Sequence, residues 1–327
     1  MSEFIPRSEV KTFHDEALRQ FDHLMINEHD AKEAALVAMV RGTNAIFSGE
    51  PGGSKSTFAL NAYRVIDGIS SDDIAHVPPM ADISPKELVG GHVTATKETA
   101  NGRETTTTII DGIVHEDAKV LYGDEISRLN PHAANSLLGA LEERRLITSA
   151  GEVALNGLIF AMFTMNPSEH QQGTFKITHA MASRMSVGAE LGGNPDSEDE
   201  IIDGILGGFK PAPKAMSPVA SAADLAAMRV RAERGVAFPT SLHGETKQLI
   251  KNMRSTFGES GVKEAPGRMT VQVRDVAQTL AVLNGEEAVQ RENVEQAVRL
   301  VAGARFAALG TSGRGSAHDV INEMLQK

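Results

Sequence analysis

The stretch Gly49-Glu50-Pro51-Gly52-Gly53-Ser54-Lys55-Ser56 decides the fold of this 327-residue chain. It follows a short apolar run, Asn44–Phe47, and precedes a helical pattern that continues to Ile66. It lies close to the phosphate-loop pattern G-x-x-x-x-G-K-[ST], in which backbone N–H groups and a helix N-terminus face an anion. Ser54 stands where the pattern has glycine, and because serine is small we expect the loop to close. The alternative is a glycine-rich turn with an incidental lysine.

The loop also predicts which atoms would contact a nucleotide. Lys55 would reach the β- and γ-phosphates, and the Ser56 hydroxyl would ligate Mg²⁺. The candidate nucleotide-binding residues of this stretch are Gly49, Glu50, Pro51, Gly52, Gly53, Ser54, Lys55, Ser56 and Thr57.

Two later strand ends carry polar residues that could act with this loop. An apolar run from Val120 ends in Asp124 and Glu125, and the very apolar run 158–165 ends at Asn166. An aspartate there can hold the Mg²⁺ shell, and the next glutamate can orient and deprotonate a water molecule. Asn166 would help to position that water. Taken alone, the acidic pair is more often a turn and the asparagine a strand cap.

The pattern along the chain predicts an α/β fold with a mostly parallel sheet of five strands. Strand-like runs at 44–47, 74–77, 118–122, 158–165 and 185–191 alternate with helical runs at 13–41, 55–66 and 135–145. Such alternation is typical of a parallel sheet covered on both faces. β-Branched runs around Asn101-Gly102, and the residues near 150–151, predict two β-hairpin inserts.

Beyond residue 192 the strand patterns stop. Helical patterns cover 198–206, 222–234, 242–257, 270–283 and 292–309, and Pro211-Ala212-Pro213 is typical of a linker. We therefore predict an α/β domain over residues 1–192 and a small all-α lid domain over residues 193–327.

Composition excludes several classes of site. Lys plus Arg number 32 and Asp plus Glu 43, a net charge of −11, which disfavours nonspecific nucleic-acid binding. The absence of cysteine excludes disulfides, Cys-ligated zinc, iron–sulfur clusters and thiol nucleophiles. Residues 1–11 lack the apolar region of a signal peptide, and no apolar run approaches the length of a membrane helix. We expect a soluble cytoplasmic protein.

Several motifs together resemble the MoxR-type AAA+ ATPases. The resemblance rests on residues 49–57, 121–128, 140–144 and 164–174, and on residues 85–90 with the hairpin after them. It covers nearly the whole chain, and the order of the motifs carries it. It implies a P-loop AAA+ core with a five-stranded sheet, hairpin inserts and an all-α lid, which binds ATP with Mg²⁺.

The resemblance also assigns roles to single residues. Lys55 and Ser56 match the Walker A motif, Asp124 and Glu125 match Walker B, and Asn166 matches sensor 1. Asp124 is thus implied in nucleotide and Mg²⁺ binding together with Ser56.

Four arginines match further family positions. Arg184 lies where the family carries its arginine finger, although its flanking residues differ from the usual Asp and Phe. Arg128 matches an arginine that can lie at a subunit interface. Arg268 aligns best with sensor 2, and Arg274 is the alternative. Arg184, Arg268 and Arg274 could each instead be a surface charge. The implied catalytic set is Glu125, Asn166, Arg184 and Arg268.

By this resemblance the chain is a Mg²⁺–ATP hydrolase. It implies a homo-oligomeric ring, expected to be a hexamer, that remodels or activates a partner protein with chaperone-like work. Partners with von Willebrand factor A domains are implied as well. Two alternatives remain open: a catalytically weak nucleotide-dependent scaffold, suggested by Ser54 and the residues flanking Arg184, and a nucleic-acid remodeller, which the acidic composition disfavours.

Overall fold

The structure is a computed structural model that describes residues 4–99, 102–166, 174–192, 194, 198–259, 265–311 and 315–326. Its strands are β1 (Asn44–Gly49), β2 (Ile66–Asp67), β3 (Ile74–Val77), β4 (Gly91–Thr99), β5 (Gly102–Ile110), β6 (Val120–Gly123), β7 (Arg145–Thr148), β8 (Gly151–Ala154), β9 (Phe160–Met165), β10 (Val187–Leu191) and β11 (Ala220–Ser221). Its α-helices are α1 (Arg7–Phe21), α2 (His29–Arg41), α3 (Lys55–Asn61), α4 (Pro85–Val89), α5 (Pro131–Ser136), α6 (Leu138–Glu142), α7 (His179–Ala182), α8 (Glu198–Leu206), α9 (Ala222–Arg234), α10 (His243–Glu259), α11 (Pro266–Leu283), α12 (Arg291–Leu309) and α13 (Ala317–Gln326).

A five-stranded parallel sheet forms the centre of the molecule. Its strand order is β10-β1-β9-β6-β3, and every neighbouring pair is parallel. All residues of β1, β6 and β9 are buried, as expected for strands covered on both faces. Because the strands are parallel, their carboxyl ends share one edge, where Gly49 pairs with Leu191 and Ser48 with Met165. This α/β fold confirms the predicted fold class.

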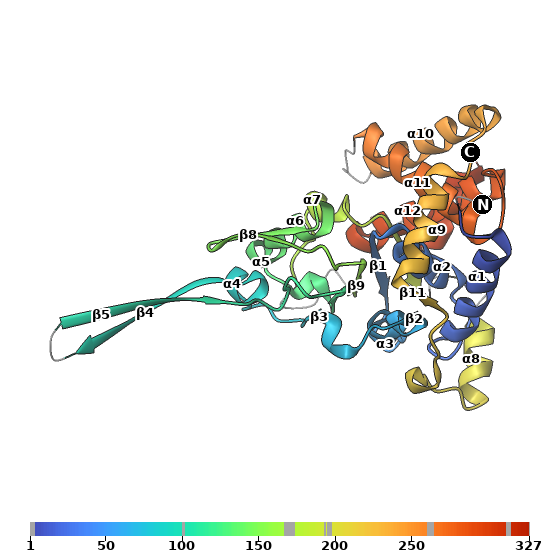
Figure 1. The fold of residues 1–327 in the computed structure, drawn as a ribbon. Helices are drawn as coiled ribbons and strands as arrows, with labels where there is room; N and C mark the ends of the chain where they lie inside the picture. Colours follow the sequence, from blue (N-terminus) through green and yellow to red (C-terminus); the bar gives the residue numbers. More distant parts are fainter. Residues whose placement is uncertain are drawn as a thin grey trace.

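The C-terminal helices pack directly on this sheet. Helix α12 lies on β10 and β1, and α11 contacts α12, α9, α2 and α1 (Figure 1). The contact between α12 and β10 needs two glycines, because a Cβ on Gly303 would lie 2.4 Å from the carbonyl oxygen of Gly188. One buried cluster joins residues of α1 and α2 to the sheet and to α9–α13. The boundary at 192/193 stays a prediction.

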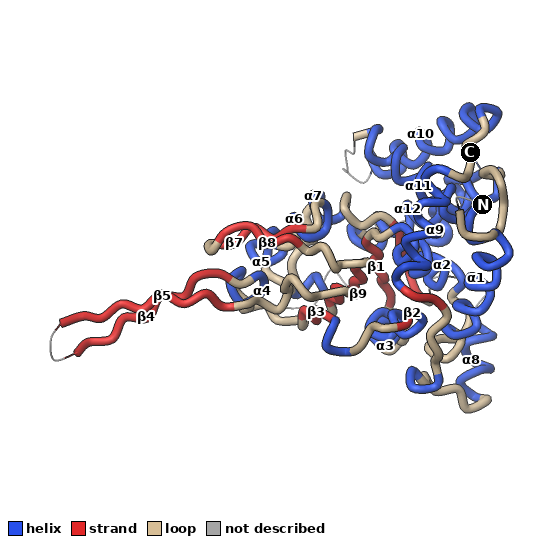
Figure 2. Tube along the Cα trace, in the orientation of Figure 1, coloured by secondary structure: helices blue, strands red, loops and turns tan. Residues whose placement is uncertain are grey.

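Two hairpins extend from the edge of the core. Strands β4 and β5 pair antiparallel over nine residues each and project far from the body of the molecule (Figures 1 and 2). Strands β7 and β8 form the shorter hairpin. At the base of the long hairpin a Cβ on Gly112 would lie 2.3 Å from the backbone nitrogen of Gly90. The two backbone segments can therefore approach only because both residues are glycine. Both predicted inserts are confirmed.

Three helical segments differ from the sequence pattern. The single helix predicted over residues 13–41 is wrong: α1 and α2 are separated by a turn in which Asn27 and Glu28 have φ of 54° and 57°, a geometry that interrupts a right-handed helix. The helix predicted over 55–66 ends at Asn61, where a 3-10 turn leads into β2. The helix predicted over 135–145 breaks at Leu137 into α5 and α6. Helix α13 has no counterpart in the sequence prediction.

Within the described residues, no helix combines the length and the apolar character that crossing a membrane requires.

Candidate functional site

The phosphate loop connects β1 to α3 at the carboxyl edge of the sheet. Gly49 has φ of 147°, and a Cβ there would lie 2.5 Å from the carbonyl oxygen of Leu191, so only glycine fits. The N–H of Gly53 donates to the carbonyl of Glu50 at 3.3 Å and tightens the loop. Ser54 has φ of 59°, a left-handed conformation that glycine adopts freely and serine only with strain. The loop therefore closes with serine in the place of glycine.

Lys55 begins α3 with its ammonium group inside the loop. The side chain is 5% exposed, and Nζ donates to the carbonyl oxygen of Glu50 at 2.7 Å. Burial lowers the pKa of Lys55, while the charges of Glu125, Glu50 and Asp124 act in the opposite direction. A cation thus lies beside the acidic pair at the floor of the loop.

Three hydroxyl groups converge on one carboxylate oxygen of Asp124. Its Oδ1 accepts from Ser56 Oγ at 2.8 Å, Tyr122 Oη at 2.8 Å and Thr164 Oγ1 at 2.7 Å. Burial tends to raise the pKa of Asp124, but these hydrogen bonds outweigh it and hold the pKa below its usual range. Asp124 is therefore ionised at neutral pH, next to the hydroxyl of Ser56.

Glu125 follows at the end of β6 and has φ of 41°. Asn166 Nδ2 donates to its Oε1 at 2.8 Å, and Arg128 forms an ion pair with its Oε2. Its backbone N–H donates to Thr164 Oγ1 at 3.0 Å. The structure therefore brings Glu125 and Asn166 together beside Asp124 and Ser56, as the sequence predicts.

The sequence motifs miss Tyr122 and Thr164 as members of this site. Each is a polar residue in an otherwise apolar strand, and Thr164 is 0% exposed. Burial, the charge of Asp124 and the hydrogen bond to it raise the pKa of the Tyr122 hydroxyl, so it remains a donor. The signal available in the sequence is a hydroxyl within a fully buried strand, since such a group needs a partner.

A cavity of about 420 Å³ opens beside the phosphate loop. Its volume falls in the usual range for small-molecule sites, roughly 300–1,000 Å³. Loop residues form one wall, and apolar residues from the turn before α2 and from α8 and its following segment form the others: Met25, Ile26, Ile201, Ile205 and Phe209. An apolar cavity next to a phosphate loop suits an aromatic base.

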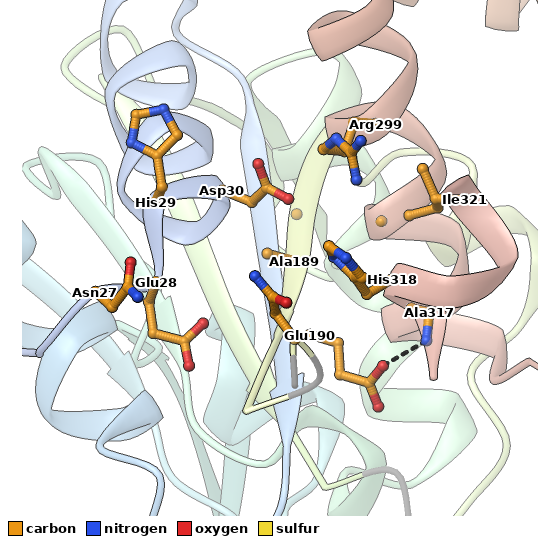
Figure 3. Close-up of a pocket in the computed structure, with 13 residues that line it drawn as sticks. Asn27, Glu28, His29, Asp30, Ala189, Glu190, Arg299, Ala317, His318 and Ile321 are labelled. Atoms are coloured by element: carbon orange, nitrogen blue, oxygen red, sulfur yellow. Dashed lines mark hydrogen bonds between the residues drawn. The ribbon is translucent and has the colours of Figure 1, made fainter. Parts of the chain in front are cut away.

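A second cavity, of about 250 Å³, lies between α2, β10, α12 and α13 (Figure 3). It is lined largely by polar groups, but its acids already have partners. The Glu190 carboxylate accepts from the N–H of Ala317 at 2.6 Å, and Asp30 accepts from the Gln296 amide at 2.8 Å. Across the described ranges, no three His, Asp or Glu residues are arranged to hold a metal ion.

Glu28 lines both cavities and lies in the strained turn before α2. Its carboxylate accepts from the N–H of Gly192 at 2.7 Å. Burial raises the pKa of Glu28 above its usual value, although this hydrogen bond lowers it in part.

Arg184 and Arg268 lie together, away from the phosphate loop. Both pair with the carboxylate of Glu142, Arg268 at 2.5 Å, and Arg268 also donates to Ser183 Oγ at 2.9 Å. The carbonyl of Arg184 accepts from Asn44, the first residue of β1, at 2.9 Å. At about 3.3 Å per residue, β1 separates this group from the phosphate loop by about 16 Å.

Both arginines therefore lie at the amino edge of the sheet, and the phosphate loop lies at its carboxyl edge. Neither guanidinium is positioned to contact a nucleotide in its own loop. Arg274, the alternative sensor, pairs with its neighbour Asp275 at 2.7 Å.

The chain resembles known proteins over its α/β part. Residues 44–187 match the family described as "ATPase family associated with various cellular activities (AAA)". Structural protein ORF618 of Acidianus two-tailed virus is 26% identical over 143 residues, which are 44% of this chain and 22% of the viral protein. The chain thus spans about a fifth of that relative.

A solved structure shares the whole architecture. The crystal structure of a candidate ATPase from Cytophaga hutchinsonii superposes with a TM-score of 0.71, covering 98% of this chain and 96% of that one at 17% identity. This likeness extends the common fold beyond the matched segment to the C-terminal helices. The segment with the parallel sheet, the phosphate loop and the acidic strand end, residues 44–187, is thus similar to the AAA family of ATPases.

Proposed function

We propose that this protein binds Mg²⁺–ATP at the phosphate loop and hydrolyses it. The observation that carries the proposal is the cluster at the carboxyl edge of the sheet. There Lys55, Ser56 and Asp124 lie beside Glu125, whose Oε1 accepts a hydrogen bond from Asn166 Nδ2 at 2.8 Å.

The residues present fit both the nucleotide and the ion. Lys55 and the N–H groups of the loop supply positive charge for the phosphates, and the apolar cavity accommodates the base. Ser56 and Asp124 offer two oxygen ligands 2.8 Å apart, the ligand type that Mg²⁺ prefers beside phosphates. When bound, Mg²⁺ neutralises charge that develops on the phosphate oxygens.

Glu125 is the proposed general base. Asn166 and Arg128 fix its two oxygens, and each oxygen keeps a second lone pair that can accept a proton from an attacking water. The proton moves to the Glu125 carboxylate as the water oxygen bonds to the γ-phosphorus; the bond from that phosphorus to the β,γ-bridging oxygen breaks, and ADP leaves with the bond's electron pair.

The positions of Arg184 and Arg268 support a ring. Because both lie about 16 Å from their own loop, along β1, they can contact a nucleotide only in a neighbouring subunit. We propose a hexamer in which both arginines act across the interface, so that sensor 2 reads the neighbour's nucleotide. The residue motifs that resemble MoxR-type proteins support chaperone-like remodelling of a partner with a von Willebrand factor A domain, in the cytoplasm.

Two substitutions test the chemistry. Glu125→Gln should lower ATP turnover by about 10²-fold or more and leave nucleotide binding largely intact, because a general base contributes about that much. Lys55→Ala should weaken binding itself. Turnover at the wild-type level in Glu125→Gln would remove Glu125 as the base, and a wild type that binds ATP without hydrolysing it would favour the scaffold alternative.

Mixing variants tests the action across subunits. Arg184→Ala and Glu125→Gln subunits should each be inactive alone and regain part of the activity when mixed, since some interfaces then pair an intact Arg184 with an intact Glu125. Specific activity that does not depend on protein concentration, together with no gain on mixing, would show that Arg184 does not act in a neighbour.

A further inference from the structure

Helix α8 presents an acidic and apolar face to solvent. Asp199, Ile202, Asp203 and Leu206 follow the i, i+3, i+4, i+7 spacing that places residues on one side of a helix. Ile202 is 46% exposed and Leu206 is 79% exposed, although the opposite side of α8 packs over the cavity beside the phosphate loop. Neither Asp199 nor Asp203 has an ion-pair partner in the described parts of the chain. We call these four residues the α8 face.

A groove between α10 and α11 is apolar and lined by cations, and so complements the apolar and acidic α8 face. Its volume is about 420 Å³, and Phe238, Ile250 and Pro266 are among the residues that form its apolar wall. Three cations, Lys247, Lys251 and Arg254, line it from α10. No aspartate or glutamate is among the described residues that line it.

The three cations are available for an external partner. They follow i, i+4, i+7 spacing along α10, so they extend over about 10 Å, the same length as Asp199 to Leu206 on α8. All three are exposed, and none takes part in an ion pair with any residue that the structure describes. A row of this length suits several acids on a helix better than one small anion. In a chain of net charge −11, unpaired cations gathered around an apolar groove form a local exception.

The two surfaces cannot meet within one chain. In Figure 1, α8 lies at the lower end of the molecule, below α1, and α10 lies at the upper end. Helix α8 borders the phosphate-loop cavity, whereas α11, the other wall of the groove, carries Arg268 in its first turn. A contact between them therefore joins two copies head to tail, which is the kind of interface that closes into a ring.

We propose that the α8 face of one subunit docks in the α10–α11 groove of the next. Ile202 and Leu206 enter the apolar groove, and Asp199 and Asp203 pair with the cations of α10. The contact brings the Arg268 edge of one subunit toward the phosphate-loop edge of its neighbour. This inference rests on the ring of the proposed function and names the surfaces that build it.

A charge exchange tests this interface. Asp199→Lys with Asp203→Lys, and separately Lys247→Glu with Lys251→Glu, should each raise the concentration needed for assembly at least about tenfold at 0.1 M salt, or ~1.4 kcal/mol per interface. All four substitutions in one chain should restore assembly to within a fewfold of wild type. Mixing the two reversed proteins should also restore it, because α8 and α10 of unlike subunits are then complementary. Assembly is measured by sedimentation velocity with an ATP analogue.

The control is Glu116→Lys with Asp117→Lys, an equal change of charge at exposed residues outside both surfaces. It should leave assembly unchanged, and circular dichroism should show each variant folded. Reversed variants that assemble like wild type, or a four-residue exchange that stays dissociated while folded, would overturn the interface but leave the ring standing. A wild type that remains monomeric overturns both, while ATP binding by the monomer still tests the loop separately.

Discussion

Replacing Thr164 by valine tests whether a single buried hydroxyl holds the acidic pair in place. Thr164 is 0% exposed, its Oγ1 donates to Asp124 at 2.7 Å, and it accepts from the N–H of Glu125 at 3.0 Å. Valine has nearly the same shape, so the substitution removes two hydrogen bonds without opening a large cavity. It also leaves the N–H of Glu125 without its partner.

The expected loss follows from these contacts. A hydrogen bond to a charged group contributes about 1.5–3 kcal/mol, and an unsatisfied N–H costs about 1 kcal/mol or more. The free energy of unfolding should therefore fall by about 2–4 kcal/mol. The pKa of Asp124 should rise, because one of its three hydroxyl donors is lost. Affinity for Mg²⁺–ATP should fall with it.

Urea unfolding followed by far-ultraviolet circular dichroism measures the first effect, since the chain has no tryptophan to report by fluorescence. Thr164→Ser is the matched control: it keeps the hydroxyl and loses one buried methyl group, at about 1 kcal/mol. A valine variant as stable as wild type, or more stable than the serine variant, would refute the argument that the hydroxyl matters more than the methyl group.

Two further substitutions test strain and burial near the same site. Ser54→Gly should raise the free energy of unfolding by about 0.5–1 kcal/mol. Relief of the left-handed conformation is worth ~1–2 kcal/mol, which exceeds the extra entropy that glycine gives the unfolded chain. Ser54→Ala, the control, should give no gain, and denaturant unfolding measures both. Glu28→Gln should stabilise the protein at pH 8 and change its stability little at pH 4. The pKa of Glu28 is higher in the folded than in the unfolded state, so the protein loses stability as the pH rises through the folded-state pKa. Thermal unfolding at both pH values checks this, and equal effects at both would contradict it.

Regular elements with a clear period could be predicted from the sequence. The strand Ile74–Val77 and the helices Glu198–Leu206 and Ala222–Arg234 have their predicted bounds. In each, the alternation or helical repeat of apolar residues is local information. The break between α1 and α2 could not be predicted, because Asn27 and Glu28 adopt left-handed geometry without glycine or proline to signal it.

The residues of the candidate site likewise divide into those that could be predicted from the sequence and those that could not. Asp124, Glu125 and Asn166 could be placed together because they follow the ends of β6 and β9, and Lys55 because it ends the loop after β1; parallel strands bring such ends together. The partnership of Arg184 with Arg268 could not, since it depends on how α11 packs against α6 and α7. Residues 167–173, part of the motif stretch used for the resemblance, lie outside the described residues.

The long hairpin has a mechanical consequence. Strands of nine residues reach about 30 Å from their base, so a tilt of about 10° there displaces the tip by about 5 Å. The base adjoins α4, and the preceding segment is tied by Asn130, whose amide donates to the carbonyls of Ala81 and Ile83 at 3.1 and 2.7 Å. Asn130 follows two residues after Arg128, which contacts Glu125. A sub-ångström movement of Glu125 beside a bound γ-phosphate would thus be transmitted through Arg128 and Asn130 to the base of the hairpin. The length of the hairpin would amplify it into a displacement of several ångströms at the tip.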